Sequence, residues 1–121
     1  MSSLRDMRWL RVALALLFAA ILLIAGGPGF RSRRLLDEHY AKHGREFGKI
    51  TEDQYLLLAQ GLRDAPLGGD ILQIVKPGGI ITRYDRRSHA FGAYNHDRTI
   101  RTFFIPNDGE RYFRRQGSRP D

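Results

Sequence analysis

The chain has 121 residues, a formal net charge of +7 and no cysteine. This length allows at most one domain beyond an apolar N-terminal run, and the lack of cysteine excludes disulfides, thiolate metal sites and a cysteine nucleophile. The charge is uneven, because residues 31–75 hold seven basic against seven acidic residues, whereas residues 76–121 hold ten against five. A basic C-terminal half favours a polyanionic partner, either nucleic acid or anionic lipid.

Residues 1–30 are predicted to be a signal peptide or an N-terminal membrane anchor. Arginines precede an uninterrupted apolar run over residues 12–25, which is the pattern of an export signal. The uncharged stretch extends to Phe30 and is then just long enough to span a bilayer. Cleavage after Gly27 or Gly29 and retention as an anchor both fit. We therefore expect an exported or membrane-anchored chain, in the bacterial cell envelope or outside the cell, with residues 12–30 contacting the membrane if they are retained.

Two helices are predicted next. Ser32 is suited to cap a helix over residues 33–43, and Gly44 is placed to end it as the C′ residue. A second helix is predicted over residues 52–63, because Thr51 and Gln54 have the spacing of a capping box and apolar residues recur behind them at helical intervals.

Four short runs rich in β-branched and aromatic residues then predict strands, over residues 71–76, 80–84, 90–94 and 99–105. Their linkers are turn-sized, so consecutive strands must pair antiparallel. A fifth strand is predicted over residues 111–114. Residues 31–121 are therefore expected to form one α+β domain, with two N-terminal helices packed on one face of a four- to five-stranded antiparallel sheet.

The first helix carries His39 and His43, one turn apart, so both imidazoles share a face. Imidazole titrates near physiological pH, and this pair, with Lys42 between them, can accept and return a proton. From spacing alone, a solvated helix face is the more common arrangement. A zinc site is also open, although no H-E-x-x-H motif is present, the third ligand is unspecified and Lys42 would crowd a cation. No metal or other cofactor is expected.

A succession of short motifs spans residues 33–114: His39, His43, Gly44, Phe47, Tyr55, Ala59, residues 83–85, Phe91, Gly92, residues 99–106 and Tyr112. Their order resembles that of the barnase/EndoU/colicin/RelE-like toxin nuclease superfamily, especially the C-terminal modules of bacterial polymorphic and contact-dependent inhibition toxins. The resemblance implies a small metal-independent ribonuclease, often acting on transfer RNA, with active-site residues from the first helix and the sheet. Such domains normally end a very large secreted protein, whereas here an export signal lies directly ahead of the domain.

The predicted catalytic residues are His39, His43, Arg83 and Thr102. Metal-free RNA cleavage needs a base for the 2′-hydroxyl, an acid for the leaving 5′-oxygen, and donors or cations for the phosphorane. The histidines would transfer protons and an arginine would clamp phosphate, while the resemblance implies that Thr102 donates its hydroxyl to phosphate. The residues predicted to bind substrate are Lys42, Arg86, Arg101 and Tyr112, the last by stacking on a base.

Other interpretations of these residues stay open. Arg83 and Arg86 also fit solvated positions, Thr102 an ordinary strand position and Tyr112 a core position. The whole chain also fits a non-catalytic, membrane-anchored or envelope binding protein with a basic surface. If it is a toxin-type ribonuclease, RNA is the substrate and a cognate immunity protein is a further partner.

Strand alternation adds one geometric expectation. Along residues 100–105 it places Thr102 on the face of Ile100 and Phe104, and Arg101 on the face of Phe103. The nuclease hypothesis requires the two histidines, an arginine and the threonine to surround one site.

Overall fold

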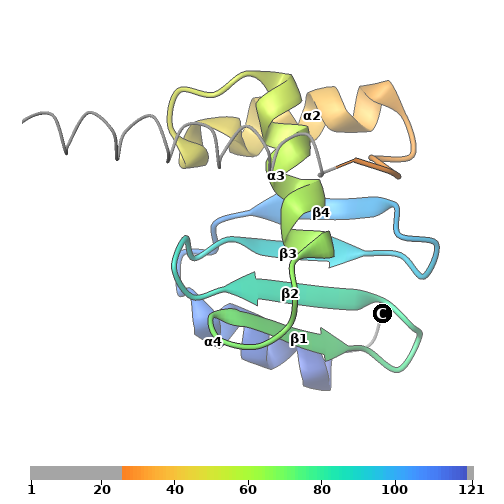
Figure 1. The fold of residues 1–121 in the computed structure, drawn as a ribbon, viewed down its shortest axis with the longest axis vertical. Helices are drawn as coiled ribbons and strands as arrows, with labels where there is room; N and C mark the ends of the chain where they lie inside the picture. The colour runs from red at the N-terminus through yellow and green to blue at the C-terminus, as the bar shows by residue number, and fades with distance from the viewer. Residues whose placement is uncertain (1–25, 120–121) are drawn as a thin grey trace, which may run out of the picture.

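The computed structural model describes residues 26–119 as an α+β arrangement of three α-helices and a four-stranded antiparallel sheet (Figure 1). The elements in chain order are α2 (Arg33–His43), the 3-10 turn η1 (Gly44–Phe47), α3 (Glu52–Asp64), β1 (Ile71–Val75), β2 (Ile81–Asp85), β3 (Phe91–Tyr94), β4 (Ile100–Phe104), α4 (Glu110–Arg115) and the 3-10 turn η2 (Gln116–Ser118).

The helices α2 and α3 form where the sequence predicts them. The Ser32 hydroxyl accepts a first-turn amide of α2, and Thr51 and Gln54 form the predicted capping box of α3. The predicted C′ role of Gly44 is wrong, because its φ is −54° and the chain continues into η1. Glycine is required there for space, since a Cβ would lie 2.5 Å from the ring of Tyr40.

The four strands pair in the order β1-β2-β3-β4, each antiparallel to the next, as predicted. Helix α3 lies across one face of the sheet, and α2 lies beside the edge strand β4 (Figure 1). Helix α4 lies against the opposite face. The expectation that the helices cover a single face is therefore wrong, because the C-terminal residues supply a cover for the second face.

The predicted fifth strand over residues 111–114 is also wrong, since these residues belong to α4. Phe113 is 1% exposed and stacks on Tyr84 of β2. Glu110 pairs with Arg114 one helical turn later. The adjacent aromatic residues give this stretch local strand propensity, but helical spacing buries Phe113 and forms the ion pair.

A β-bulge overturns the alternation predicted for β4. The register with β3 shifts by one residue and leaves Arg101 as the extra residue. As a result Ile100 and Phe103 both pack in the core beneath α3, although they are three residues apart. Thr102 shares the α4 face with Phe104, but it does not share a face with Ile100.

Two buried tyrosines connect α3 to the sheet. Tyr55 and Tyr94 are fully buried, and their hydroxyls donate to the carbonyls of Phe103 and Ala59 respectively. Burial raises the pKa of both hydroxyls, so both remain protonated donors. Each tyrosine therefore adds a satisfied hydrogen bond to the apolar area it buries.

Residues 26–30, called the strap below, pack on this domain although the sequence places them with the N-terminal segment. The Gly29 carbonyl accepts the Ile100 amide at 2.9 Å, and Phe30 forms a parallel bridge with Ile100 at the outer edge of β4. The Phe30 ring stacks on Tyr55 at 6.5 Å and on His39 at 4.9 Å between ring centroids. The strap thus covers part of a strand edge and contacts one of the predicted catalytic histidines.

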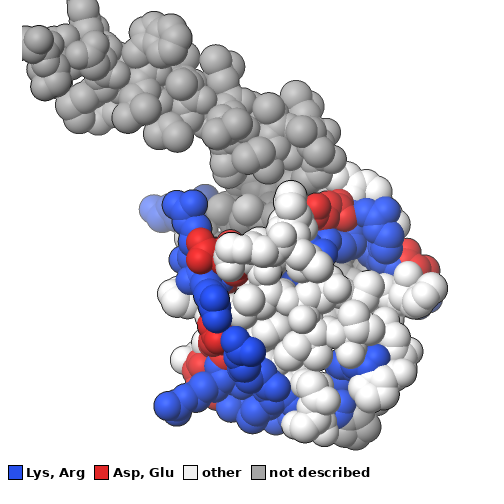
Figure 2. Space-filling model, turned by 60° about the horizontal axis from the view of Figure 1, so that its bottom comes forward, with Lys and Arg blue, Asp and Glu red and all other residues white. Residues whose placement is uncertain are grey.

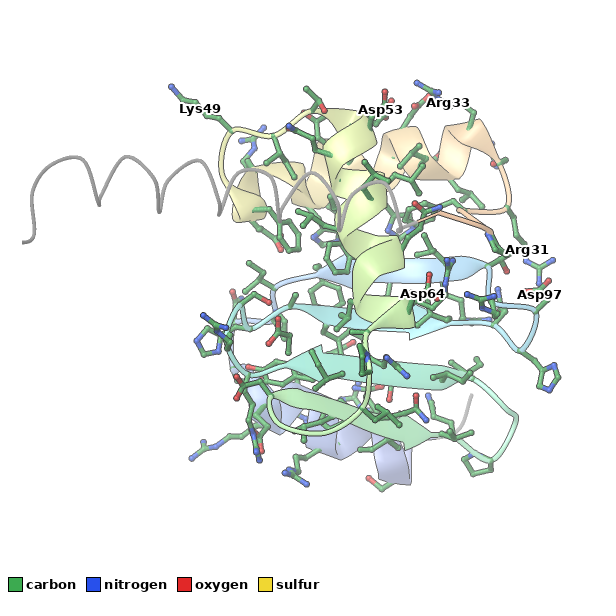
Figure 3. All side chains as sticks on the ribbon, in the orientation of Figure 1. Arg31, Arg33, Lys49, Asp53, Asp64 and Asp97 are labelled. Carbon is green, nitrogen blue, oxygen red and sulfur yellow. The ribbon has the colours of Figure 1, made fainter. Side chains whose placement is uncertain are left out.

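Arg63 of α3 binds the backbone of the strap. Its side chain is 4% exposed, and its guanidinium donates to the carbonyls of Gly26 and Pro28, to the Arg98 carbonyl and to the Asp64 carboxylate. Figure 3 shows Asp64 at the end of α3, over the sheet. Hydrogen bonds from Arg63 and then Arg98 lower the pKa of Asp64. A buried guanidinium needs all of these acceptors, so the strap is part of the fold.

Within residues 26–119, no helix has the length and apolar character to cross a membrane. The apolar run over residues 12–25, predicted to be a signal or anchor, lies outside the described residues.

We predict opposite effects for alanine at two glycines. At Gly92 a Cβ would lie 2.2 Å from the buried Tyr94 hydroxyl, whereas at Gly61, inside α3, it would meet nothing within 4 Å. Gly92→Ala should lower the free energy of unfolding by about 2 kcal/mol, and Gly61→Ala should raise it by roughly 0.5 to 1 kcal/mol. Urea unfolding measures both, and a change of the same sign at the two sites would contradict the packing.

We also predict that the strap is needed for stability. A chain lacking residues 1–25 should unfold with nearly the same free energy as the full-length chain. A chain lacking residues 1–30 should lose about 3 kcal/mol or more, because the buried guanidinium of Arg63 loses two of its acceptors, the carbonyls of Gly26 and Pro28. Thermal and urea unfolding of the two deletions test this, and equal stability would show that the strap contributes nothing.

Candidate histidine site

His43, the last residue of α2, is held from two sides. Its Nδ1 lies 2.8 Å from Oε2 of Glu46, and its ring stacks on Phe104 with centroids 5.1 Å apart. The other carboxylate oxygen, Oε1 of Glu46, accepts the backbone amide of Ile105 at 2.8 Å. The side chain of His43 is 15% exposed, so one edge of the ring still reaches solvent.

The turn η1 is what makes this contact. Because the chain continues past Gly44 in a 3-10 turn, the carboxylate of Glu46 comes back alongside the ring three residues before it. A carboxylate can only accept, so Nδ1 of His43 carries a hydrogen and Nε2 holds the lone pair of the neutral ring. Sequence reasoning missed Glu46 as a functional residue, although an acidic residue three positions after a candidate histidine was visible.

His39 lies one turn earlier, with its ring centroid 6.2 Å from that of His43. Phe30 of the strap stacks on it, and its Nδ1 is buried with no hydrogen-bond partner among the described residues. Burial lowers the pKa of His39, and the neighbouring His43 and Lys42 lower it further. The ring is therefore neutral at pH 7, and a proton on Nε2 suits the unpartnered Nδ1 better than a buried N–H would.

Two further predicted residues, Tyr112 and Thr102, lie on the same side of the sheet as Phe104, the residue that stacks on His43. The Tyr112 ring of α4 packs edge-on against Phe104 at 5.3 Å, and the Arg115 guanidinium lies 5.9 Å from the centre of the Tyr112 ring. Thr102 is partly buried on the same face of β4 as Phe104. We call His39, His43, Glu46, Phe104 and Tyr112 the histidine site. Lys42 is exposed on α2 between the two histidines.

Arg83 is not brought to this site. Its guanidinium donates to the carbonyls of Leu62 and Ala65 at 3.1 and 2.5 Å, and its Nε donates to Gln73 at 2.9 Å. These bonds satisfy carbonyls at the C-terminal end of α3, on the face of the sheet opposite Thr102, and burial lowers the pKa of Arg83. Arg83 thus caps the C-terminal end of α3.

Arg86 and Arg101 lie apart from His39 and His43 and from each other. Arg86 pairs with Glu110 of α4 at 2.8 Å. Arg101, the bulge residue, donates to Asn95 at 3.0 Å and lines a hollow with Arg31, which itself pairs with Asp97 at 3.7 Å (Figure 3). Of the predicted arginines, only Arg86 joins a larger basic surface.

The zinc alternative lacks a third ligand in the part of the chain that the structure describes. Within residues 26–119, no three His, Asp or Glu side chains lie close enough together to hold a metal ion.

No protein-family model matches this chain, and no curated protein matches it. The resemblance to toxin nucleases therefore stays a prediction from the order of its motifs.

The lowered pKa of His39 predicts a pH dependence of stability. In the unfolded chain this histidine binds a proton as the pH falls through about 6.5, whereas the folded ring resists protonation. Its contribution is therefore complete above the unfolded pKa and is lost as the pH falls toward the folded pKa. Between about pH 7 and pH 5, His39→Gln should make the free energy of unfolding fall less steeply than it does in the unaltered chain.

Urea unfolding at several pH values measures this slope. His96→Gln, at an exposed position of the β3–β4 turn, is the matched control and should leave the slope close to that of the unaltered chain. A His39 variant as sensitive to acid as the unaltered chain would contradict the assignment.

Proposed function

We propose that this chain is a metal-independent ribonuclease of toxin type, which cleaves RNA by attack of the 2′-hydroxyl on the adjacent phosphate. The single observation that supports it most is the His43–Glu46 pair beside a neutral His39. A carboxylate-oriented imidazole is equipped to remove a proton from a hydroxyl. The exposed part of its side chain can meet a nucleotide, for which its aromatic neighbours offer a stacking surface.

His43 is the proposed base. With Nδ1 donating to Glu46, Nε2 can accept the proton of the 2′-hydroxyl, and the carboxylate stabilises the imidazolium that forms. The 2′-oxygen then bonds to phosphorus, and the bond from phosphorus to the 5′-oxygen breaks. The leaving oxygen takes up a proton, which the protonated His43 can return. The products are a 2′,3′-cyclic phosphate and a free 5′-hydroxyl.

His39 is the proposed donor to the phosphate. A neutral ring with its proton on Nε2 can hydrogen-bond a non-bridging oxygen, and the adjacent Lys42 adds positive charge. The Thr102 hydroxyl remains a candidate second donor from β4. Arg83 is engaged with the end of α3, so we assign it a structural part instead of phosphate binding.

The base of the nucleotide has an aromatic surface available. Phe104 and Tyr112 are both partly exposed; Phe104 stacks on His43, and Tyr112 packs against Phe104. Stacking on such rings is the usual way in which single-stranded RNA is held, and it is tolerant of sequence. Unpaired RNA, including the loops of transfer RNA, is the proposed substrate.

The N-terminal apolar run extends the proposal to location. A chain of this kind would act from a membrane anchor or after export, and a cell producing it would be protected by a cognate immunity protein. The alternative function is a non-catalytic envelope protein that uses its basic surface for binding.

Changing both histidines should abolish cleavage. The purified full-length chain should cut fluorescent RNA in the presence of a chelator and leave 2′,3′-cyclic phosphate ends. His39→Ala combined with His43→Ala should reduce the rate by about a hundredfold or more, because one positioned acid or base typically contributes about 10² to 10⁴ in rate. His96→Ala, on an exposed turn, is the control and should keep full activity.

The outcomes separate the alternatives. A folded double variant, as judged by circular dichroism, that cuts RNA as fast as the unaltered chain would refute the assignment of the histidines. Loss of activity in chelator would point to a metal reaction. RNA binding without any cleavage by the unaltered chain would favour the binding protein.

A further inference from the structure

We propose that α4 and the β2–β3 turn bind the phosphates of a single-stranded polynucleotide that extends from the histidine site. The binding residues are Arg86, Arg87, Arg111, Arg114 and Arg115, called the arginine face below. The inference rests on the proposed function for RNA as the natural ligand, whereas the surface itself is argued from its own charges and contacts.

One carboxylate organises two of these arginines. Glu110 accepts from Arg86 at 2.8 and 3.4 Å, and from Arg114 at 3.0 and 2.8 Å. Hydrogen bonds from Arg86 and then Arg114 lower the pKa of Glu110 to about 2, so it stays ionised. A single negative charge thus orients two guanidiniums and leaves one positive charge uncompensated.

The remaining arginines add to this excess. Arg115 pairs with Asp108 at 2.6 Å, and its side chain remains 45% exposed. Arg87 and Arg111 are exposed and take part in no ion pair among residues 26–119. The nearby Asp85 is occupied by its own turn, where it accepts the Arg87 amide. Figure 2 shows basic side chains in a column on the side where Figure 1 places the β2–β3 turn and the start of α4.

The arginine face adjoins the histidine site by two routes. Arg115 lies over Tyr112, which contacts Phe104, and Phe104 in turn contacts His43. Along the other route, Arg111 lines a hollow with Ile105, whose amide is bound by the same Glu46 that holds His43. A chain bound at His43 can therefore continue onto the arginines without crossing the core.

The chemistry of the face favours nucleic acid over lipid. Guanidinium groups bind phosphates bidentately, and rings beside them offer stacking surfaces, which together are typical of single-strand binding. A membrane-binding helix would instead present large apolar side chains to the bilayer. The exposed large hydrophobic residues in the described part of the chain are Leu67 and Val75, and neither belongs to α4.

Two charge-matched triple variants of the full-length chain test the proposal. One changes Arg111, Arg114 and Arg115 to glutamine, and the other changes Arg31, Arg33 and Lys49 to glutamine. The second set lies on the side of α2 and η1, away from α4 (Figure 3). The probe is a fluorescent oligodeoxythymidine of about 12 nucleotides, which lacks the 2′-hydroxyl and so binds without being cleaved. Fluorescence anisotropy gives Kd at NaCl concentrations from about 50 to about 200 mM.

The α4 variant should bind at least about tenfold more weakly at the lowest salt. Its plot of log Kd against log salt should flatten by about 2, because each lost contact with a single strand removes about 0.7 from the slope. The control variant should keep most of the slope. The single change Arg111→Gln, at an arginine without an ion pair among residues 26–119, should remove about 0.7 and gives a readout if the triple variant fails to fold.

An unchanged slope in the α4 variant, or an equal loss in both triple variants, would overturn the proposal. The proposal would also be overturned if the α4 variant kept oligonucleotide binding but no longer bound phosphatidylserine vesicles. The arginine face would then bind lipid headgroups. Because the probe cannot be cleaved, a loss specific to α4 stands even if the histidines prove not to be catalytic. Cleavage that depends on the histidines would likewise stand if this binding test failed.

Discussion

The buried guanidinium of Arg63 is the constraint on which the rest of this structure depends. Its five N–H groups are taken up by the Asp64 carboxylate and by the carbonyls of Gly26, Pro28 and Arg98. A charge at this depth is tolerable only when its donors are satisfied, so α3, the strap and the β3–β4 turn must come together at one point. Apolar packing alone would allow these segments to slide, whereas the directions of the hydrogen bonds do not.

The edge of β4 shows how the fold and the candidate site are joined. An edge strand presents unpaired amides that invite pairing with other chains. Here the Ile100 amide is bound by the strap, and the Ile105 amide is bound by Glu46. The groups that protect the edge are thus the ones that pack against His39 and orient His43. Stability and the proposed chemistry share these contacts, so mutations along the edge should affect both.

Much of the architecture could be predicted because its signals are local. The Ser32 cap and the capping box of Thr51 and Gln54 act within one turn, and linkers after residue 76 are too short for a parallel crossover. The predictions from sequence are wrong where residues distant in the chain determine the local structure. Residues 111–114 carry strand-forming side chains, but they form a helix whose Phe113 stacks on the distant Tyr84 of β2. Alternation along β4 fails because one bulged residue shifts every later side chain, and nothing in the local pattern announces it.

The candidate site was also predictable in part, wherever its geometry depends on residues close together in the sequence. The spacing of His39 and His43 fixes their common face without tertiary information, and both indeed lie together. Arg83 could not be excluded from sequence, because the carbonyls it caps belong to residues some twenty positions earlier. Glu46 could not be assigned either, since its contact with His43 depends on a 3-10 turn where the sequence predicts a helix end.

The contacts between the strap and β4 also constrain the order in which the chain can fold. The strap is the first described segment to leave a ribosome or a translocation channel, yet its partners include Arg98 and Ile100. His39 and His43 likewise emerge long before Phe104 and Tyr112. Contacts so distant along the chain form only when both ends are free to meet. A nascent or threading chain therefore carries its histidines without the aromatic residues of β4 and α4 until those two elements have emerged.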